Sequence, residues 1–96
     1  MGELLTLDDF APRVGDRFAV RAEGGDDLAL ELVQARGLGP GYEQREAFSL
    51  LFRGPADPAL PQATYRLAHD GLGDLDIFIV PVGEGQDGRD YEAIFN

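Results

Sequence analysis

The chain has 96 residues, and its 18 acidic side chains outnumber eight basic ones, all arginine, for a formal net charge of −10. The length suits a single domain, residues 1–96, and a hydrophobic fraction of 44% supplies a core, which excludes a disordered chain. This charge repels nucleic-acid backbones and anionic lipid surfaces, and no arginine cluster offsets it locally. We therefore expect a soluble domain that binds neither nucleic acid nor membrane.

The sequence also predicts the compartment. Cysteine is absent, which excludes disulfides, thiolate nucleophiles and cysteine-ligated metals. The first residues lack the basic and apolar regions of a signal peptide, and the longest apolar run, Ile77 to Val82, is far shorter than a membrane span. We expect the protein to be cytoplasmic.

The first third of the chain predicts a helical turn and two strands. Thr6 to Phe10 reads as one helical turn, with Thr6 as the cap and acidic residues in the first turn. From Arg17 apolar and polar residues alternate with a period of two, and the alternation resumes from Leu28 to Val33 after an Asp- and Gly-rich turn. These two runs predict a β-hairpin.

The remainder predicts four more strands. Arg36 to Gly41 contains three glycines and a proline, so we expect a long loop there that continues to about Arg45. Three prolines between Gly54 and Pro61 predict an irregular crossing. Alternation predicts strands at Ala47–Arg53, Thr64–Ala68, Leu75–Val82 and Asp90–Phe95.

The predicted fold class is all-β, with a short N-terminal helical turn. Six short strands joined mostly by Gly and Asp turns are typical of an antiparallel meander, closed into a small six-stranded barrel or folded as a two-sheet sandwich. No linker divides the chain into two domains.

One face of the predicted sheet is apolar where a polar face is expected. Val33, Leu51, Phe78 and Val80 lie on this second face, together with Ser49, Val82 and Ile94. One explanation is that the N-terminal turn, with Leu4, Leu5, Leu7 and Phe10, covers it. The other is that it binds a protein partner or a second copy, because exposed apolar patches on soluble domains mark such sites.

No motif in the sequence carries catalytic, cofactor or metal chemistry. His69 and Ser49 are the only histidine and serine, and Ser49 lacks the Gly-x-Ser-x-Gly elbow of a hydrolase. The acidic turns lack the spacing of calcium loops, and a Walker loop needs a lysine. Tyr42 and Glu43, in the Gly-rich loop, form the rim of a candidate site for a small ligand or carbohydrate.

Several segments together resemble a known family. They are Leu5 to Phe10, Val14-Gly15, Phe48 to Pro55, Leu60 to Gln62, Thr64 to Leu67, Leu75 to Gly83 and Tyr91 to Asn96. The chain is similar to small bacterial proteins defined as a domain of unknown function. The resemblance implies genes adjacent to those of phage tail-collar or microcystin-dependent-type proteins, and it supplies no catalytic residue.

These observations predict a non-enzymatic interaction or assembly module without a cofactor. The resemblance implies an accessory or chaperone of a tail-collar or tail-fibre-like protein, with incorporation into a tail-like assembly. The alternative prediction is a β-module that binds a small ligand or carbohydrate.

Overall fold

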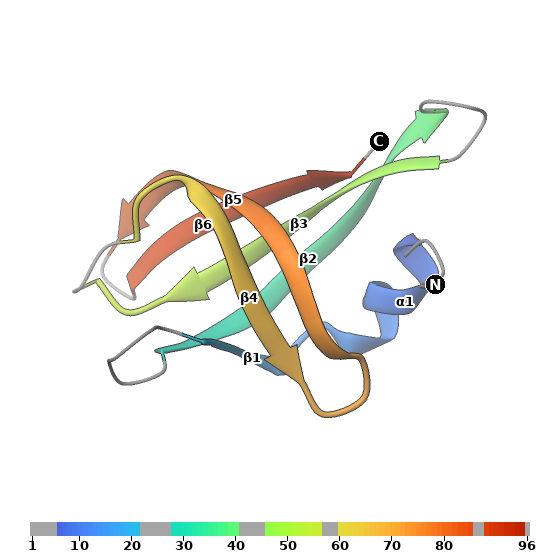
Figure 1. Ribbon diagram of the computed structural model, residues 1–96. Helices are drawn as coiled ribbons and strands as arrows, with labels where there is room; N and C mark the ends of the chain where they lie inside the picture. Colours follow the sequence, from blue (N-terminus) through green and yellow to red (C-terminus); the bar gives the residue numbers. More distant parts are fainter. Residues whose placement is uncertain (1–5, 22–27, 41–45, 57–59, 86–87, 96) are drawn as a thin grey trace.

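The protein is a closed, strongly coiled β-barrel with a short helix at one end, as the computed structural model shows (Figure 1). The structure describes residues 6–21, 28–40, 46–56, 60–85 and 88–95. Its elements in chain order are α1 (Leu7–Phe10), the 3₁₀ turn η1 (Ala11–Arg13), β1 (Arg17–Val20), β2 (Leu28–Pro40), β3 (Glu46–Gly54), β4 (Ala63–His69), β5 (Gly73–Gly85) and β6 (Gly88–Phe95). The structure confirms the predicted six-stranded barrel, and the alternative prediction of a two-sheet sandwich is wrong.

The order of the strands around the barrel departs from a single meander. It runs β1-β2-β3-β6-β5-β4, with every pairing antiparallel. Two three-stranded meanders are thus joined by the crossing between β3 and β4. Because this crossing carries the chain to the far side of the first meander, β4 pairs with β1 at Ala19↔Ala68 and Val20↔Leu67, and β6 returns beside β3.

β2 is longer than the sequence predicts. The expected loop from Arg36 is wrong for residues 36–40, which continue the strand and pair with β3. Register shifts at Leu32/Gln34 and at Gly37/Gly39 absorb the irregular sequence, and Gly39 has φ 97°, a conformation that favours glycine. The glycines therefore bend this strand without ending it.

The barrel interior is filled by inward-facing side chains from all six strands and from α1. The buried cluster comprises Phe10, Phe18, Val20, Leu30, Leu32, Phe48, Leu50, Phe52, Leu67, Ile77, Ile79, Tyr91 and Ala93. Phe10 is fully buried, and its ring centroid lies 5.8–6.4 Å from those of Phe18, Phe48 and Phe95. The Thr6 backbone N–H donates to Asp9 Oδ2 at 2.8 Å and fixes the start of this helix.

Side-chain hydrogen bonds fasten the crossing between β3 and β4. The Leu60 N–H donates to the buried Tyr91 hydroxyl at 3.0 Å, and the Tyr65 hydroxyl donates to the Pro61 carbonyl at 2.7 Å. Burial, and to a lesser extent Tyr91, raises the pKa of Tyr65. The crossing is therefore held to β4 and β6 by two tyrosines.

β6 lies close against the backbone of β3 at Gly88, next to Gly54. Gly88 has φ 134°, and a Cβ there would overlap the Gly54 carbonyl oxygen. We expect Gly88→Ala to lower the free energy of unfolding by about 2–4 kcal/mol, because it adds both backbone strain and a clash. Gly83→Ala is the matched control, since its added Cβ meets no atom within 4 Å. Urea unfolding of both variants is the measurement, and equal midpoints would contradict the prediction.

Candidate functional site

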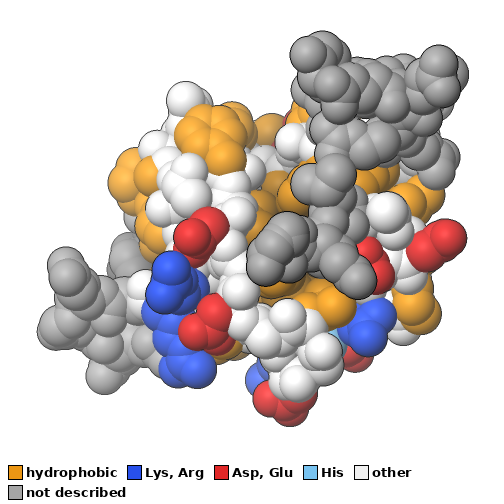
Figure 2. Space-filling view, turned by 45° about the vertical axis from the view of Figure 1, so that its right-hand side comes forward, with side chains coloured by type: hydrophobic (Ala, Val, Ile, Leu, Met, Phe, Trp, Pro, Cys, Tyr) orange, Lys and Arg blue, Asp and Glu red, His pale blue; other side chains and the backbone are white. Residues whose placement is uncertain are grey.

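Large hydrophobic side chains are exposed on the outside of the wall formed by β3, β6 and β5. Phe78 and Val82 of β5 are 50% and 51% exposed, and Ile94 of β6 is 56% exposed. Leu51 of β3 and Val80 of β5 are half-buried on the same side. We call these five residues the outer apolar face. Figure 2 shows hydrophobic side chains reaching the surface at the upper left of the view, bordered below by charged ones.

The strand register brings two of the predicted partner-surface residues close together. Leu51 pairs with Glu92, and Glu92 pairs with Val80, so the three form one row across the wall. Phe78 lies two residues from Val80 on the same side of β5. Val33 falls in the bulge of β2, where Gln34 is the residue opposite Leu51. Val33 thus lies one strand away, at the margin of the outer apolar face.

The N-terminal turn does not cover this face with the residues that the structure describes. Phe10 lies inside the barrel, and Leu7 packs against the same interior cluster. The explanation that these two side chains lie over the second face is therefore wrong, because they complete the filling of the interior. Leu4 and Leu5 are outside the described residues.

The centre of the outer apolar face holds one carboxylate that sequence reasoning did not single out. Glu92 is half-buried between Leu51 and Val80, and no ion pair to it occurs within the described ranges. The alternation of β6 puts Glu92 on the outside, but its apolar neighbours come from strands distant in sequence. Only the strand order could reveal the surroundings of this carboxylate.

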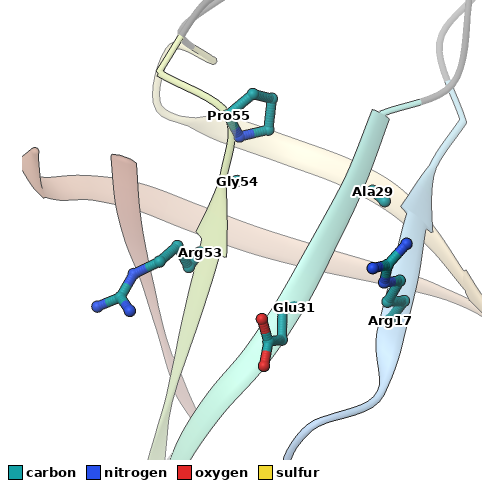
Figure 3. A pocket seen from close by; sticks show the side chains of 6 residues that line it. All are labelled: Arg17, Ala29, Glu31, Arg53, Gly54 and Pro55. Atoms are coloured by element: carbon teal, nitrogen blue, oxygen red, sulfur yellow. The ribbon is translucent and has the colours of Figure 1, made fainter. Parts of the chain in front are cut away.

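A second candidate site is a hollow of about 460 Å³ on the outside of β1, β2 and β3. Its lining residues are Arg17, Ala29, Glu31, Arg53, Gly54 and Pro55 (Figure 3). Its volume falls in the range of small-molecule sites. None of the described residues that line it is aromatic, so among them it offers polar contacts and no surface on which a sugar ring stacks.

The hollow lies along a row of alternating charges. Arg17 pairs in register with Glu31, Glu31 with Arg53, and Arg53 with Asp90. Arg53 reaches away from the hollow, as Figure 3 shows, and donates from Nε to Asp90 Oδ1 at 2.8 Å. Arg17 and Glu31 form no ion pair within the part of the chain that the structure describes. One cation and one anion thus remain available to a ligand.

His69 forms a third polar cluster, at the end of β4. Its Nδ1 accepts the backbone N–H groups of Gly71 at 2.9 Å and Leu72 at 3.1 Å. The ring proton is therefore on Nε2, which donates to Asp16 Oδ2 at 2.8 Å. The ring also packs on Phe18 with a centroid distance of 4.6 Å. Because both ring nitrogens are engaged, this histidine fastens the β4–β5 turn.

Ser49 and the predicted ligand rim do not join these clusters. Ser49 is buried on β3, opposite Ile94 and Arg36, and β3 and β4 are not neighbours in the barrel. The structure therefore gives no contact between Ser49 and His69. Tyr42 and Glu43 lie outside the described residues, so the rim stays a prediction.

Comparison with known proteins identifies the family. The sequence profile of a domain of unknown function (DUF6916) matches residues 5–95. The chain belongs to this family. A search of curated proteins and a search of solved structures each find no match to the chain. The predicted membership of a family defined as a domain of unknown function is thus confirmed.

Two further features concern membranes and metals. In the described ranges no helix is both long and apolar enough to cross a membrane. Within the same residues, no three side chains of histidine, aspartate or glutamate gather where they could hold a metal ion.

From the hydrogen bonds of His69 we predict that its side chain stabilises the fold. We expect His69→Phe, which keeps the ring on Phe18, to lower the free energy of unfolding by about 2 kcal/mol, because two backbone N–H groups lose their acceptor. Asp16→Ala is the control, with an expected loss below about 1 kcal/mol, since Asp16 is nearly half exposed. Thermal unfolding measures both. A larger loss for Asp16→Ala would contradict this assignment.

Proposed function

We propose that the protein is a non-enzymatic interaction or assembly module that binds a protein partner through the outer apolar face. The observation that carries this proposal is the half exposure of Phe78, Val82 and Ile94 on one wall of the barrel. Hydrophobic side chains gathered in this way are typical of protein-binding surfaces. Glu92, at their centre, would fix the orientation of a partner that presents a basic side chain.

The closed fold supports this use of the outside wall. The buried cluster fills the interior, so a partner would bind to the outer surface. Aromatic and branched side chains at the centre of an interface contribute most of the binding energy when a partner excludes water from them. Phe78 is therefore the residue to which we assign the largest contribution.

The partner that we propose is a phage tail-collar or tail-fibre-like protein. This part of the proposal rests on the gene neighbourhood that the family resemblance implies. The protein would act as its accessory or chaperone, from the cytoplasm, and would enter a tail-like assembly with it. Self-association through the same face is the competing hypothesis, and the experiment must distinguish it from binding of this partner.

Charge substitutions on the face test the proposal. We expect Leu51→Glu and Phe78→Glu to abolish co-elution with a co-expressed collar-type protein in size exclusion, because each buries an unpaired charge in the interface. Val14→Glu is the matched control, since Val14 is 47% exposed but precedes β1, away from this face. Unfolding midpoints establish that all three variants fold.

Two outcomes would contradict the proposal. One is independent elution of the unsubstituted protein and the collar-type protein at micromolar concentrations. The other is co-elution that persists in both charge variants. Light scattering on the protein alone detects self-association and so distinguishes it from binding of the collar-type protein. A homodimer that is lost in Phe78→Glu would assign the face to a second copy.

A second candidate function is the binding of a small polar ligand in the hollow on β1, β2 and β3. The specific observation is that Arg17 and Glu31 adjoin this hollow without an ion pair within the described residues. Their charges suit a ligand that carries both an anionic and a cationic group. Because no described lining residue is aromatic, such a ligand is favoured over a carbohydrate.

A thermal-shift screen of amino acids, small zwitterions and sugars tests this second function. We expect a zwitterion to raise the melting temperature and Arg17→Gln to remove that rise, because the guanidinium holds the anionic group. Arg36→Gln, an exposed arginine of β2 outside the hollow, is the control and should keep it. The idea fails if no compound stabilises the protein or if the rise survives Arg17→Gln.

A further inference from the structure

The pairing of β5 with β6 covers only part of each strand. It runs from Gly85↔Gly88 to Val80↔Glu92 and stops there. β5 continues beyond this point through Gly73–Ile79, and β6 continues through Ala93–Phe95. Figure 1 shows the two strands together at the left and separating toward the right, where α1 lies. We call this opening the β5–β6 split.

Each strand that borders the split has a partner on its other side only. Gly73–Ile79 pairs with β4, and Ala93–Phe95 pairs with β3. α1 contacts chiefly β2 and β3, so it is not a strand partner for either edge. Within the residues that the structure describes, the backbone N–H and C=O groups of Gly73–Ile79 that point away from β4 thus have no strand partner.

An unpaired strand edge selects the kind of partner that can bind it. Its backbone groups are satisfied best by another extended chain, which adds main-chain hydrogen bonds as a further strand. Seven residues correspond to roughly 20 Å of strand, enough for a short linear segment. The edge therefore favours an extended peptide over a folded surface.

The apolar side chains along the split match such a segment. Phe78 and Ile94, both at least half exposed, lie on the outside of the two strands. Leu75 and Phe95, each half-buried, pack against the interior cluster from the same strand segments. A bound strand would therefore meet apolar side chains on both of its faces.

The charges beside the split favour a basic partner. Asp74 and Asp76 lie on the outside of β5, and Glu92 lies where the split begins. Arg66 binds Asp76, with Nε to Oδ1 at 3.1 Å, and this contact raises the pKa of Arg66. Asp74 and Glu92 have no ion-pair partner within the described residues. Lysine or arginine could pair with them while its aliphatic stem covers Phe78 or Ile94.

We propose that an extended segment of the protein partner adds as a strand to the β5 edge at Gly73–Ile79. The segment alternates apolar side chains, which contact Leu75 and Phe95, with basic ones, which reach Asp74 and Glu92. This inference rests on the proposed function and narrows it to strand addition by a basic, amphipathic peptide.

Hydrogen exchange in the free protein tests the open edge. We expect the amides of Gly73–Ile79 that point away from β4 to exchange faster than those of Phe48–Phe52 in β3, which has neighbours on both sides. Uniformly slow exchange throughout Gly73–Ile79 would overturn the proposal, because it would show that the edge is already occupied.

Peptide titration followed by NMR tests strand addition itself. The probe is an acetylated and amidated seven-residue peptide that alternates valine with lysine. Two controls carry N-methyl groups on the valine amides or on the lysine amides, which removes the donors of one strand edge at a time. We expect the probe to protect Gly73–Ile79 from exchange and at least one methylated peptide to lose this effect.

Side-chain variants test the charge assignment in the same titration. Glu92→Gln should weaken binding of the peptide about five-fold, since it removes one ion pair. Glu31→Gln, on β2 beside the hollow, is the control and should leave the affinity unchanged.

Three outcomes would overturn strand addition while leaving the proposed interface standing. They are equal binding of the probe and both methylated peptides, a probe effect confined to residues outside the split, and protection of Gly73–Ile79 by self-association that rises with protein concentration in the absence of peptide. The proposed function itself fails only in the co-elution experiment, so the two failures are distinguishable.

Discussion

The need to fill a small closed barrel determines how the rest of the molecule is arranged. Six strands enclose a space that side chains must occupy at the density of a protein interior. The strands supply most of it, and α1 completes it by inserting Phe10 among Phe18, Phe48 and Phe95. Because the helix is used inside, its apolar residues are not available to cover the outside wall. The exposure of Phe78 and Ile94 follows from this division.

Closure also explains the irregular features of the strands. β6 comes so close to the Gly54 carbonyl of β3 that Gly88 has no room for a side chain, and a side chain at Gly54 would meet Leu30 of β2. The bulges of β2 increase the coiling that lets a 13-residue strand follow the barrel. Pairing of β5 with β6 ends at Val80↔Glu92, beyond which β5 stays paired with β4 and β6 with β3. The open edge lies between these two strand pairs.

Much of the fold follows from local sequence, whereas the candidate site does not. Alternation identifies the six strands because burial of every second side chain leaves a period of two. It does not reveal that β2 continues through Gly37 and Gly39, since bulges permit glycines that usually end a strand. It also leaves open which surface Phe10 meets, because a single helical turn carries no such information, and of the two explanations for the second face the one that used Phe10 is wrong.

The site depends on which strands become neighbours, and the sequence is least informative there. Glu92 is an ordinary exposed position in the pattern of β6. Its place between Leu51 and Val80 arises only when β6 inserts between β3 and β5. The row of Arg17, Glu31 and Arg53 differs, because it lies on three consecutive strands and depends only on their register. Local patterns can therefore identify the apolar candidate residues. That Glu92 lies among them follows only from the order of the strands in the barrel.

The net charge of −10 bears on which partner the outer apolar face accepts. Two copies meeting through this face would bring Glu92 and Asp74 of one copy toward the same carboxylates of the other. Like charges forced together in an interface are strongly unfavourable, whereas a basic partner neutralises them and shields the apolar residues. The acidic side chains thus discourage the pairing of two identical edges, which is the usual hazard of an open strand. The same residues that keep copies of the chain apart favour a basic, extended partner.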